Sequence, residues 1–172
     1  SYLRRETSGF NWPIQDLERE DKLLFLDACF PRIGVPSKER FSLTVPVTFD
    51  SFIASIHDIV NQYGVNKIVV DSLGGLRRYI GGSDDAMVNL HRLSYLLTEL
   101  DCTLLLLSED VGDGTAGIHD YGEYTSQGVI ELTVVETDHG LERKLCIVKM
   151  RGLSHSLSHH VFEVTGDGLR IP

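Results

Sequence analysis

The sequence lacks the features that mark membrane-spanning, secreted and nucleic-acid-coating proteins. No apolar run approaches the roughly 18 to 20 residues that a membrane-spanning helix needs. The chain starts SYLRRETSGFNW, in which no positively charged leader precedes an apolar stretch. The net charge of -9 disfavours broad binding to a polyanion, so nucleic acid is not a favoured partner, although a local basic groove would allow it. We therefore expect no membrane association, and we find no internal repeat or low-complexity tract.

Cysteine is also scarce. The three cysteines, Cys29, Cys102 and Cys146, lie far apart, and none belongs to a CxxC pair. Two of them adjoin or lie within apolar runs, which predicts reduced thiols in the core. This use of cysteine suits a cytoplasmic protein.

Helical spacing of apolar residues predicts helices in the first half of the chain. A short helix should begin near Pro13 in WPIQDLERE. A longer helix should end at Gly64, with Asp50 or Ser51 as its N-cap. A further helix should begin at Ser83 and bury the apolar stripe Met87, Leu90, Leu93, Leu97 and Leu100.

Apolar runs between these helices predict strands at 22–28, 67–71 and 103–110. The run at 103–110 is continuously apolar, which is typical of a strand buried on both faces. Residues 30–50, rich in proline, and 111–128, rich in glycine, should be surface loops.

After the loop at 111–128, the sequence pattern becomes typical of β-strands. Strands are expected at 129–136, 143–150 and 159–165, and the first two should form a hairpin around residues 138–140. The 172 residues are enough for one domain with its own core. The predicted fold is therefore a single α/β domain with a mainly parallel sheet, flanked by helices and extended by antiparallel strands at the C-terminal end.

The stretch VNKIVVDSLGG ends a predicted buried strand on Asp71. In open α/β sheets, ligands bind outside the carboxyl ends of the strands. A carboxylate there can bind Mg²⁺ through water, act as a general base, or cap the following turn together with Ser72. The strand at 103–110 ends on Ser108 and Glu109, so two neighbouring strands should end at one polar edge.

A second informative stretch is KMRGLSHS, residues 149 to 156. Strand alternation places Lys149 and Arg151 on one face, with Met150 on the other. Two fixed cations can grip a phosphate chain, Arg by a bidentate fork and Lys as a point charge, but they can also be solvated charges at a strand end.

Three histidines follow these cations. His155, His159 and His160 could suggest a metal site, but no carboxylate or thiol completes one at a regular spacing. Solvated loop histidines are the favoured interpretation.

The order of these segments resembles the C-terminal two-thirds of a KaiC-like ATPase domain of the RecA-like P-loop superfamily. The likeness includes KIVVDSL, TLLLLSE, SQGVIEL and RKLCIVKMRGLSH, and KMRG followed by His is a fairly specific signature of the family. It extends over nearly the whole chain, including the opening SYLRRETSGFNWPIQDLERED. Residues 1–172 would then be a single partial RecA-like domain, and ATP and Mg²⁺ its implied cofactors.

The resemblance implies roles for the residues at the strand ends. Asp71 is similar to the Walker B acid, which orients Mg²⁺ at the phosphates, with Ser72 beside it. Ser108 corresponds to a polar sensor of the γ-phosphate. Lys149 and Arg151, with Met150 and His155 nearby, resemble residues that reach a neighbouring subunit's nucleotide, an arginine-finger arrangement that implies a homo-oligomer.

One part of an ATPase site is not in this sequence. A P-loop needs GxxxxGK[ST] at a helix start, and neither this motif nor the family's acidic pair is present, so the P-loop unit is missing. Two explanations stay open: a piece of a larger ATPase, or a degenerate subunit that completes a partner's site through Lys149 and Arg151. Under either explanation, we expect this chain alone to be inactive as an ATPase.

A recombination accessory protein that binds single-stranded DNA through 110–128 is a third interpretation. It is disfavoured because that segment has acids and no Lys or Arg.

Glu123 and Tyr124 stand where clock-type members of the family carry an autophosphorylated Ser and Thr, so a circadian autokinase is not expected. Leu153 and Leu157 replace residues that usually assist the nucleotide contact.

Overall fold

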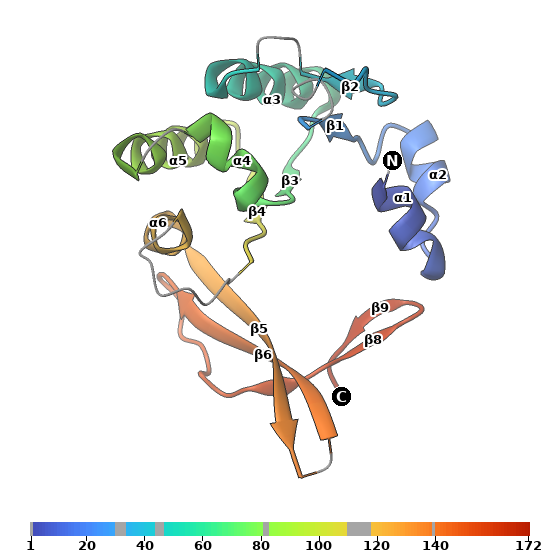
Figure 1. Cartoon of the computed structure of the whole chain (residues 1–172), viewed down its shortest axis with the longest axis vertical. Helices are drawn as coiled ribbons and strands as arrows, with labels where there is room; N and C mark the ends of the chain where they lie inside the picture. The colour runs from blue at the N-terminus through green and yellow to red at the C-terminus, as the bar shows by residue number, and fades with distance from the viewer. Residues whose placement is uncertain (1, 30–33, 44–46, 81–82, 110–117, 139) are drawn as a thin grey trace. The chain divides into compact units, whose positions relative to one another are not determined.

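The computed structural model describes residues 2–29, 34–43, 47–80, 83–109, 118–138 and 140–172 (Figure 1). The chain divides into two compact units, one formed by residues 21–125 and the other by residues 1–20 and 126–172. In the part of the chain that is described, no helix combines the length and apolarity needed to cross a bilayer.

The unit formed by residues 21–125 contains two parallel strand pairs and four helices among its described residues. The pairs are β1 with β2 and β3 with β4. The bounds of its elements are β1 Leu26–Asp27, β2 Phe41–Ser42, α3 Phe49–Tyr63, β3 Lys67–Val70, α4 Leu73–Ile80, α5 Ser83–Glu99, β4 Thr103–Leu106 and α6 Ile118–Thr125.

Helix α3 forms because an apolar stripe and two strong end signals coincide. Thr48 is its N-cap and forms a capping box with Ser51, so the prediction of Asp50 or Ser51 as N-cap is wrong; Ser51 lies three residues into the helix. Gly64 ends the helix in the left-handed conformation, φ 65°, as predicted. The helix buries Phe49, Phe52, Ile56 and Val60.

The core of this unit lies between α3, α4, α5 and one face of the β3–β4 pair. Leu93 and Leu97 of α5 are almost fully buried, whereas Met87, predicted in the same stripe, is 38% exposed. Ala86 is buried instead, because its helical spacing from Leu90 and Leu93 places it on the same face of α5.

The β3–β4 pair is covered on one face in the described part of the chain. Ile68, Val70, Leu104 and Leu106 pack against the core, whereas Val69 is 61% and Leu105 51% exposed. The prediction that 103–110 is buried on both faces is therefore wrong for its described residues. The helices cover one face, and strand alternation turns every second side chain to the other.

The second unit contains antiparallel strands and short N-terminal helices. Strands β5, β6 and β7 form one sheet, and β8 pairs with β9. Its elements are α1 Tyr2–Glu6, the 3₁₀ turn η1 Thr7–Gly9, α2 Ile14–Arg19, β5 Gly128–Thr137, β6 Gly140–Met150, β7 His160–Val161, β8 Glu163–Thr165 and β9 Gly168–Arg170.

These elements confirm the predicted α/β class with parallel pairs first and antiparallel strands last. The antiparallel pairing of β5 with β6 confirms the predicted hairpin, and the helix after Pro13 is also confirmed. Other local predictions differ. The elements α1, η1, β2, α4 and β9 were not predicted, and β2 and the buried Leu43 lie in the expected surface loop at 30–50. The strand at 22–28 shortens to β1, the strand at 159–165 divides into β7 and β8, and residues 118–125 of the expected loop at 111–128 form α6. Residue 110 of the predicted strand and residues 111–117 of that loop lie outside the described residues, and the single partial domain stays a prediction.

Candidate functional site: the ends of β3 and β4

Asp71 is the first residue after β3 and is exposed to solvent. Among the described residues, none donates a hydrogen bond to its carboxylate or forms an ion pair with it. A turn cap would accept a hydrogen bond from a nearby backbone N–H, as Asp27 does from the N–H of Cys29 at 2.8 Å. Among the described residues, the carboxylate of Asp71 therefore does not act as a turn cap, and the peptide bond that joins Asp71 to Ser72 is cis.

Backbone hydrogen bonds bring Ser108 to the same edge. The N–H of Leu107 donates to the carbonyl of Val70 at 3.0 Å, and the N–H of Leu73 donates to the carbonyl of Leu107 at 2.8 Å. These bonds continue the parallel register of Val70 with Leu106 beyond both strands. Asp71, Ser72 and Ser108 thus lie side by side at the carboxyl edge of the pair, and Ser108 is exposed.

Helix α4 starts directly after this edge. The carbonyl of Ser72 accepts the first helical hydrogen bond, from the N–H of Leu76 at 3.2 Å. Gly74 and Gly75 are poor helix formers, which is why the sequence did not predict this helix. Leu73 and Leu76, 1% and 4% exposed, show that burial in the core outweighs the low propensity. The positive end of the helix dipole therefore lies next to Asp71 and Ser72, where it favours anionic groups.

In the other unit, Lys149 and Arg151 flank Met150, the last residue of β6. The N–H of Arg151 donates to the carbonyl of Gln127 at 2.8 Å, which extends the β5–β6 ladder by one bond. Gly152 follows in the left-handed region, φ 76°, so the chain turns immediately after the arginine. Arg151 is exposed and Lys149 is partly buried.

The backbone under these two cations is closely packed. A Cβ atom at Gly128 would lie 2.9 Å from the sulfur of Met150 and 3.3 Å from the carbonyl oxygen of Lys149. The strand register also shifts between Val129 and Ile130, which leaves Val148 as an extra residue on β6. Such bulges bend a strand and re-aim the side chains that follow, here Lys149 and Arg151.

His155 lies in the stretch 151–160, in which every residue is exposed. Its Nδ1 is 3.3 Å from the carbonyl oxygen of Leu153. Over the described ranges, no three His, Cys, Asp or Glu side chains come together as a metal site would require. Any Mg²⁺ at Asp71 would therefore depend on that carboxylate, on water and on phosphate oxygens, which is the usual way proteins bind this ion with nucleotides.

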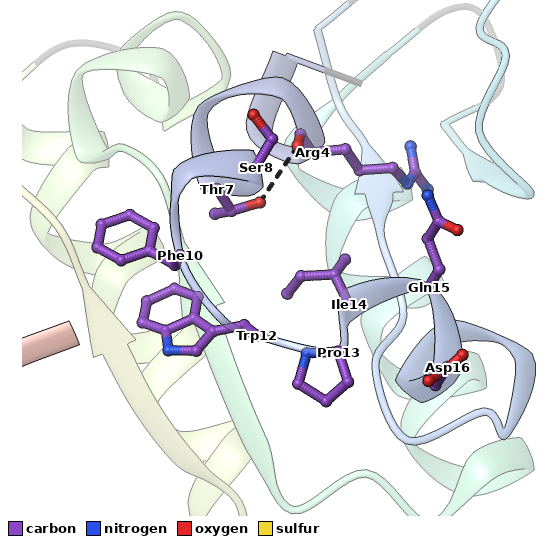
Figure 2. Close-up of a pocket in the computed structure, with 9 residues that line it drawn as sticks. All are labelled: Arg4, Thr7, Ser8, Phe10, Trp12, Pro13, Ile14, Gln15 and Asp16. Carbon is purple, nitrogen blue, oxygen red and sulfur yellow. Dashed lines mark hydrogen bonds between the residues drawn. The ribbon is translucent and has the colours of Figure 1, made fainter. Parts of the chain in front are cut away.

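A shallow pocket of about 310 Å³ lies elsewhere, in the N-terminal part of the same unit as Lys149. Figure 2 shows the stacked rings of Phe10 and Trp12, 4.5 Å between centroids, on one side of it and Arg4 on the other. Trp12 donates from Nε1 to the carbonyl of Asp167 at 3.2 Å, which ties this segment to the turn before β9. None of the predicted site residues lines this pocket.

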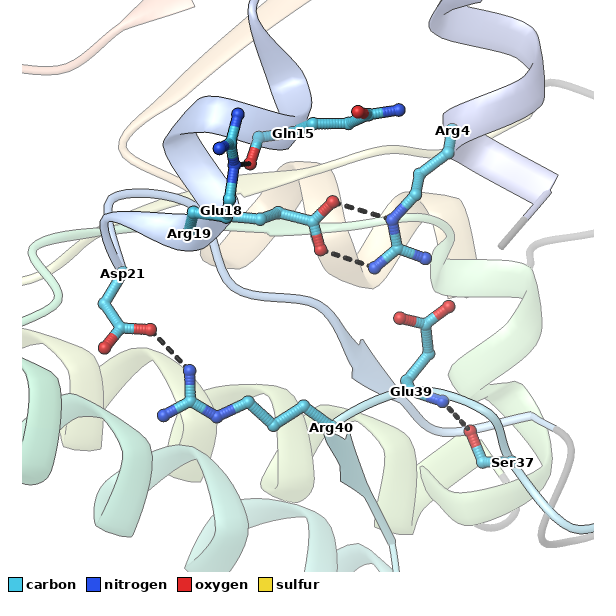
Figure 3. A network of polar contacts seen from close by, with 8 residues as sticks. All are labelled: Arg4, Gln15, Glu18, Arg19, Asp21, Ser37, Glu39 and Arg40. Carbon is cyan, nitrogen blue, oxygen red and sulfur yellow. Dashed lines mark hydrogen bonds and ion pairs between the residues drawn. The ribbon is translucent and has the colours of Figure 1, made fainter.

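The polar contacts drawn in Figure 3 hold the N-terminal segments of each unit. In one unit, Nε of Arg4 donates to Glu18 at 2.7 Å and joins α1 to α2. In the other, Arg40 pairs with Asp21. Outside the contacts drawn in the figure, Arg40 also donates to the hydroxyl of Tyr63 at 2.8 Å. The hydrogen bond to Asp21 is the main cause that raises the pKa of Arg40. These contacts have a structural role and do not involve the predicted site.

The cysteines differ in environment. Cys146 is buried, which confirms the predicted core location for that thiol, whereas Cys102 is half-buried and Cys29 is exposed. All of them are free thiols. The Sγ of Cys102 donates to the carbonyl of Val65 at 3.2 Å, and burial, followed by the charge of Asp101, raises its pKa.

A parallel pair with an acid at its carboxyl edge, followed by a long antiparallel hairpin, defines an α/β protein of the RecA-like class. The fold is similar to the crystal structure of a KaiC-like protein from Pyrococcus horikoshii, with a TM-score of 0.78 and 26% identity over 99% of this chain and 70% of that chain. The family model described as "ATPase: KaiC" matches residues 1–172. The chain belongs to the KaiC ATPase family.

Curated relatives agree with this assignment. UPF0273 proteins of Methanopyrus kandleri and Methanocaldococcus jannaschii are 31% and 32% identical, over 98% and 97% of this chain and 67% and 69% of their own lengths. The circadian clock protein KaiC3 of Synechocystis is 29% identical over 94% of this chain and 31% of its own length. The chain therefore spans about two thirds of the two archaeal relatives.

Proposed function

We propose that this chain is part of an ATP-binding and ATP-hydrolysing regulatory protein in which Asp71 binds Mg²⁺ and Ser108 contacts the terminal phosphate. The observation that supports it most is the edge formed by Asp71, Ser72 and Ser108 at the ends of two hydrogen-bonded parallel strands. Mg²⁺ held by Asp71 would neutralise negative charge on the phosphates. The chain's contribution is an exposed carboxylate and two hydroxyl groups at fixed positions.

We further propose that Lys149 and Arg151 act on the nucleotide of a neighbouring subunit. Their position at the end of a hairpin ladder, held by the Gln127 carbonyl and followed by a glycine turn, suits cations that must keep a fixed position. A cation that meets charge developed in the transition state lowers the barrier more than it tightens substrate binding. The complete protein would then be a cytoplasmic homo-oligomer with ATP at its subunit boundaries, Met150 and His155 lying beside the contact.

The alternative is a non-catalytic subunit that offers Lys149 and Arg151 to a partner's nucleotide. Turnover by the full-length product of the gene that encodes this chain separates the two proposals. A homo-oligomeric ATPase hydrolyses ATP by itself, whereas a non-catalytic subunit does so only after its partner is added.

The first test is the substitution Asp71→Asn in the full-length protein. It keeps the size of the side chain but removes the charge that attracts Mg²⁺, so Mg²⁺-dependent turnover should fall by about 100-fold or more. Asp101→Asn is the matched control, because Asp101 is an exposed acid at the amino end of β4 and asparagine tolerates its φ of 53°. A folded Asp71→Asn protein with parental turnover would contradict the proposed role.

The second test is Arg151→Ala, with Arg143→Ala as control because Arg143 is an exposed arginine at the other end of the same strand. We expect Arg151→Ala to lower kcat by about 1,000-fold while ATP affinity changes little. If kcat stayed within a few-fold of the parent, the finger role would be wrong.

A further inference from the structure

Helix α6 packs against α4 and α5 within the unit formed by residues 21–125 (Figure 1). The contact with α4 is close at one point. A Cβ atom on Gly122 would lie 3.2 Å from Cδ2 of Leu73, closer than most real Cβ contacts, so the leucine side chain or α6 would have to shift by a few tenths of an ångström. Glycine lets α6 approach the first residue of α4.

Leu73 has little room to move away. It is 1% exposed and belongs to the core cluster formed by α3, α4 and α5. Interiors of this density transmit a displacement to their neighbours instead of absorbing it. A group added at position 122 therefore moves Leu73 or moves α6.

The backbone of Leu73 is also part of the strand-end edge. Its N–H donates to the carbonyl of Leu107, the residue before Ser108, and its position is two residues after Asp71. A shift of the Leu73 side chain that is passed to its backbone would consequently act on both sides of the edge at once. Within α6, Thr125 donates from its hydroxyl to the carbonyl of Gly122 at 3.3 Å, so the glycine lies in a hydrogen-bonded turn.

We propose that Gly122 is a positioning residue for Asp71: the close contact of α6 with Leu73 fixes the strand-end edge where the acid and Ser108 lie. The inference rests on the proposed function, because it assigns a role in placing Mg²⁺ and phosphate. Catalytic geometry is sensitive to shifts of a few tenths of an ångström to 1 Å, even when the substituted residue does not touch the substrate.

The experiment measures the Mg²⁺ concentration for half-maximal ATP turnover of the full-length protein, together with its melting temperature. Gly122→Ala should raise that concentration about tenfold. Gly75→Ala is the matched control, because Gly75 is another helical glycine of this unit and an added Cβ there meets open space. It should leave the Mg²⁺ dependence unchanged.

A second variant separates positioning from loss of stability. Leu73→Val shortens the side chain that an added methyl group would meet, so Gly122→Ala combined with Leu73→Val should restore the Mg²⁺ dependence to within about twofold of the Leu73→Val protein. A purely structural role would lower the melting temperature and leave the half-maximal Mg²⁺ concentration unchanged.

The outcomes distinguish this inference from the proposed function. If Asp71→Asn abolishes turnover while Gly122→Ala matches Gly75→Ala, the positioning role is wrong and the function of Asp71 stands. If Asp71→Asn has no effect on turnover, the proposed function fails, and the positioning role fails with it.

Discussion

The N–H of Leu73 donates a hydrogen bond to the carbonyl oxygen of Leu107 across 2.8 Å. This bond joins the first residue of α4 to the segment that extends β4, and it closes the edge at which Asp71 and Ser108 lie. The same leucine packs in the core and meets Gly122 of α6. One residue therefore connects core packing, helix position and the strand ends that we propose bind Mg²⁺ and phosphate.

The N-cap of α3 should contribute measurably to stability. Thr48→Ala removes the side-chain acceptor of the Ser51 N–H and should lower the free energy of unfolding by about 1 kcal/mol. Urea denaturation measures the loss. Ser55→Ala in the middle of the same helix is the control and should cost nothing, because its hydroxyl only donates to the carbonyl of Ser51. Equal losses for the two variants would show that the cap is not the cause.

Gly64 ends α3 with a φ of 65° and has open space where a Cβ would be. An alanine there fits sterically but must adopt the left-handed conformation, which costs about 1 to 2 kcal/mol. Gly64→Ala should therefore lower the midpoint of urea unfolding, whereas Gly75→Ala, in a right-handed helix, should raise it slightly. An unchanged midpoint for Gly64→Ala would mean that the helix end can rearrange.

Leu93 of α5 lies in the core, whereas Leu105 of β4 lies on the uncovered face of the β3–β4 pair, so truncating the two side chains should have unequal costs. Leu93→Ala removes a side chain with no exposure and should cost about 2 to 5 kcal/mol. The side chain of Leu105 is 51% exposed, so Leu105→Ala should cost less than about 1.5 kcal/mol. Thermal unfolding of the two proteins measures the difference. A loss for Leu105→Ala as large as that for Leu93→Ala would mean that this face is covered in solution.

Thiol reactivity should separate the cysteines. Because burial and the charge of Asp101 raise the pKa of Cys102, its reactive thiolate is disfavoured in the folded protein. The folded state therefore keeps its full stability below the ordinary pKa of a thiol and loses part of it as the pH rises through the raised pKa of Cys102. At pH 8, iodoacetamide followed by mass spectrometry should show Cys29 modified first. Asp101→Asn should speed modification of Cys102, and an unchanged rate would exclude the charge as a contributor.

Much of this fold could be predicted because long elements have clear periodicity. The apolar spacing of α3 and α5 and the alternation of β5 and β6 are repeated over several turns or residue pairs, so single exceptions such as Met87 do not hide them. The strand ends of 67–71 and 103–110 were expected at one edge, and the parallel register of β3 with β4 places them there.

Other features depend on tertiary contacts that a sequence does not display. Gly74 and Gly75 disfavour a helix locally, yet burial of Leu73 and Leu76 stabilises α4. The contact of Gly122 with Leu73 joins residues about fifty positions apart, and glycine in a polar segment is equally typical of a loop. The exposed faces of Val69 and Leu105 show that a continuous apolar run does not reveal which of its faces is covered.

The proposed subunit boundary is tested most directly by mixing two inactive variants of the full-length protein, Asp71→Asn and Arg151→Ala, with dissociation and reassembly of their oligomers. Mixing should restore about a quarter of wild-type turnover, because about one boundary in four joins an intact Asp71 to an intact Arg151 of the neighbouring subunit. Recovery should require reassembly and should be absent from each variant alone. A mixture that assembles but stays as inactive as its components would contradict the arrangement in which one subunit supplies the acid and its neighbour the arginine.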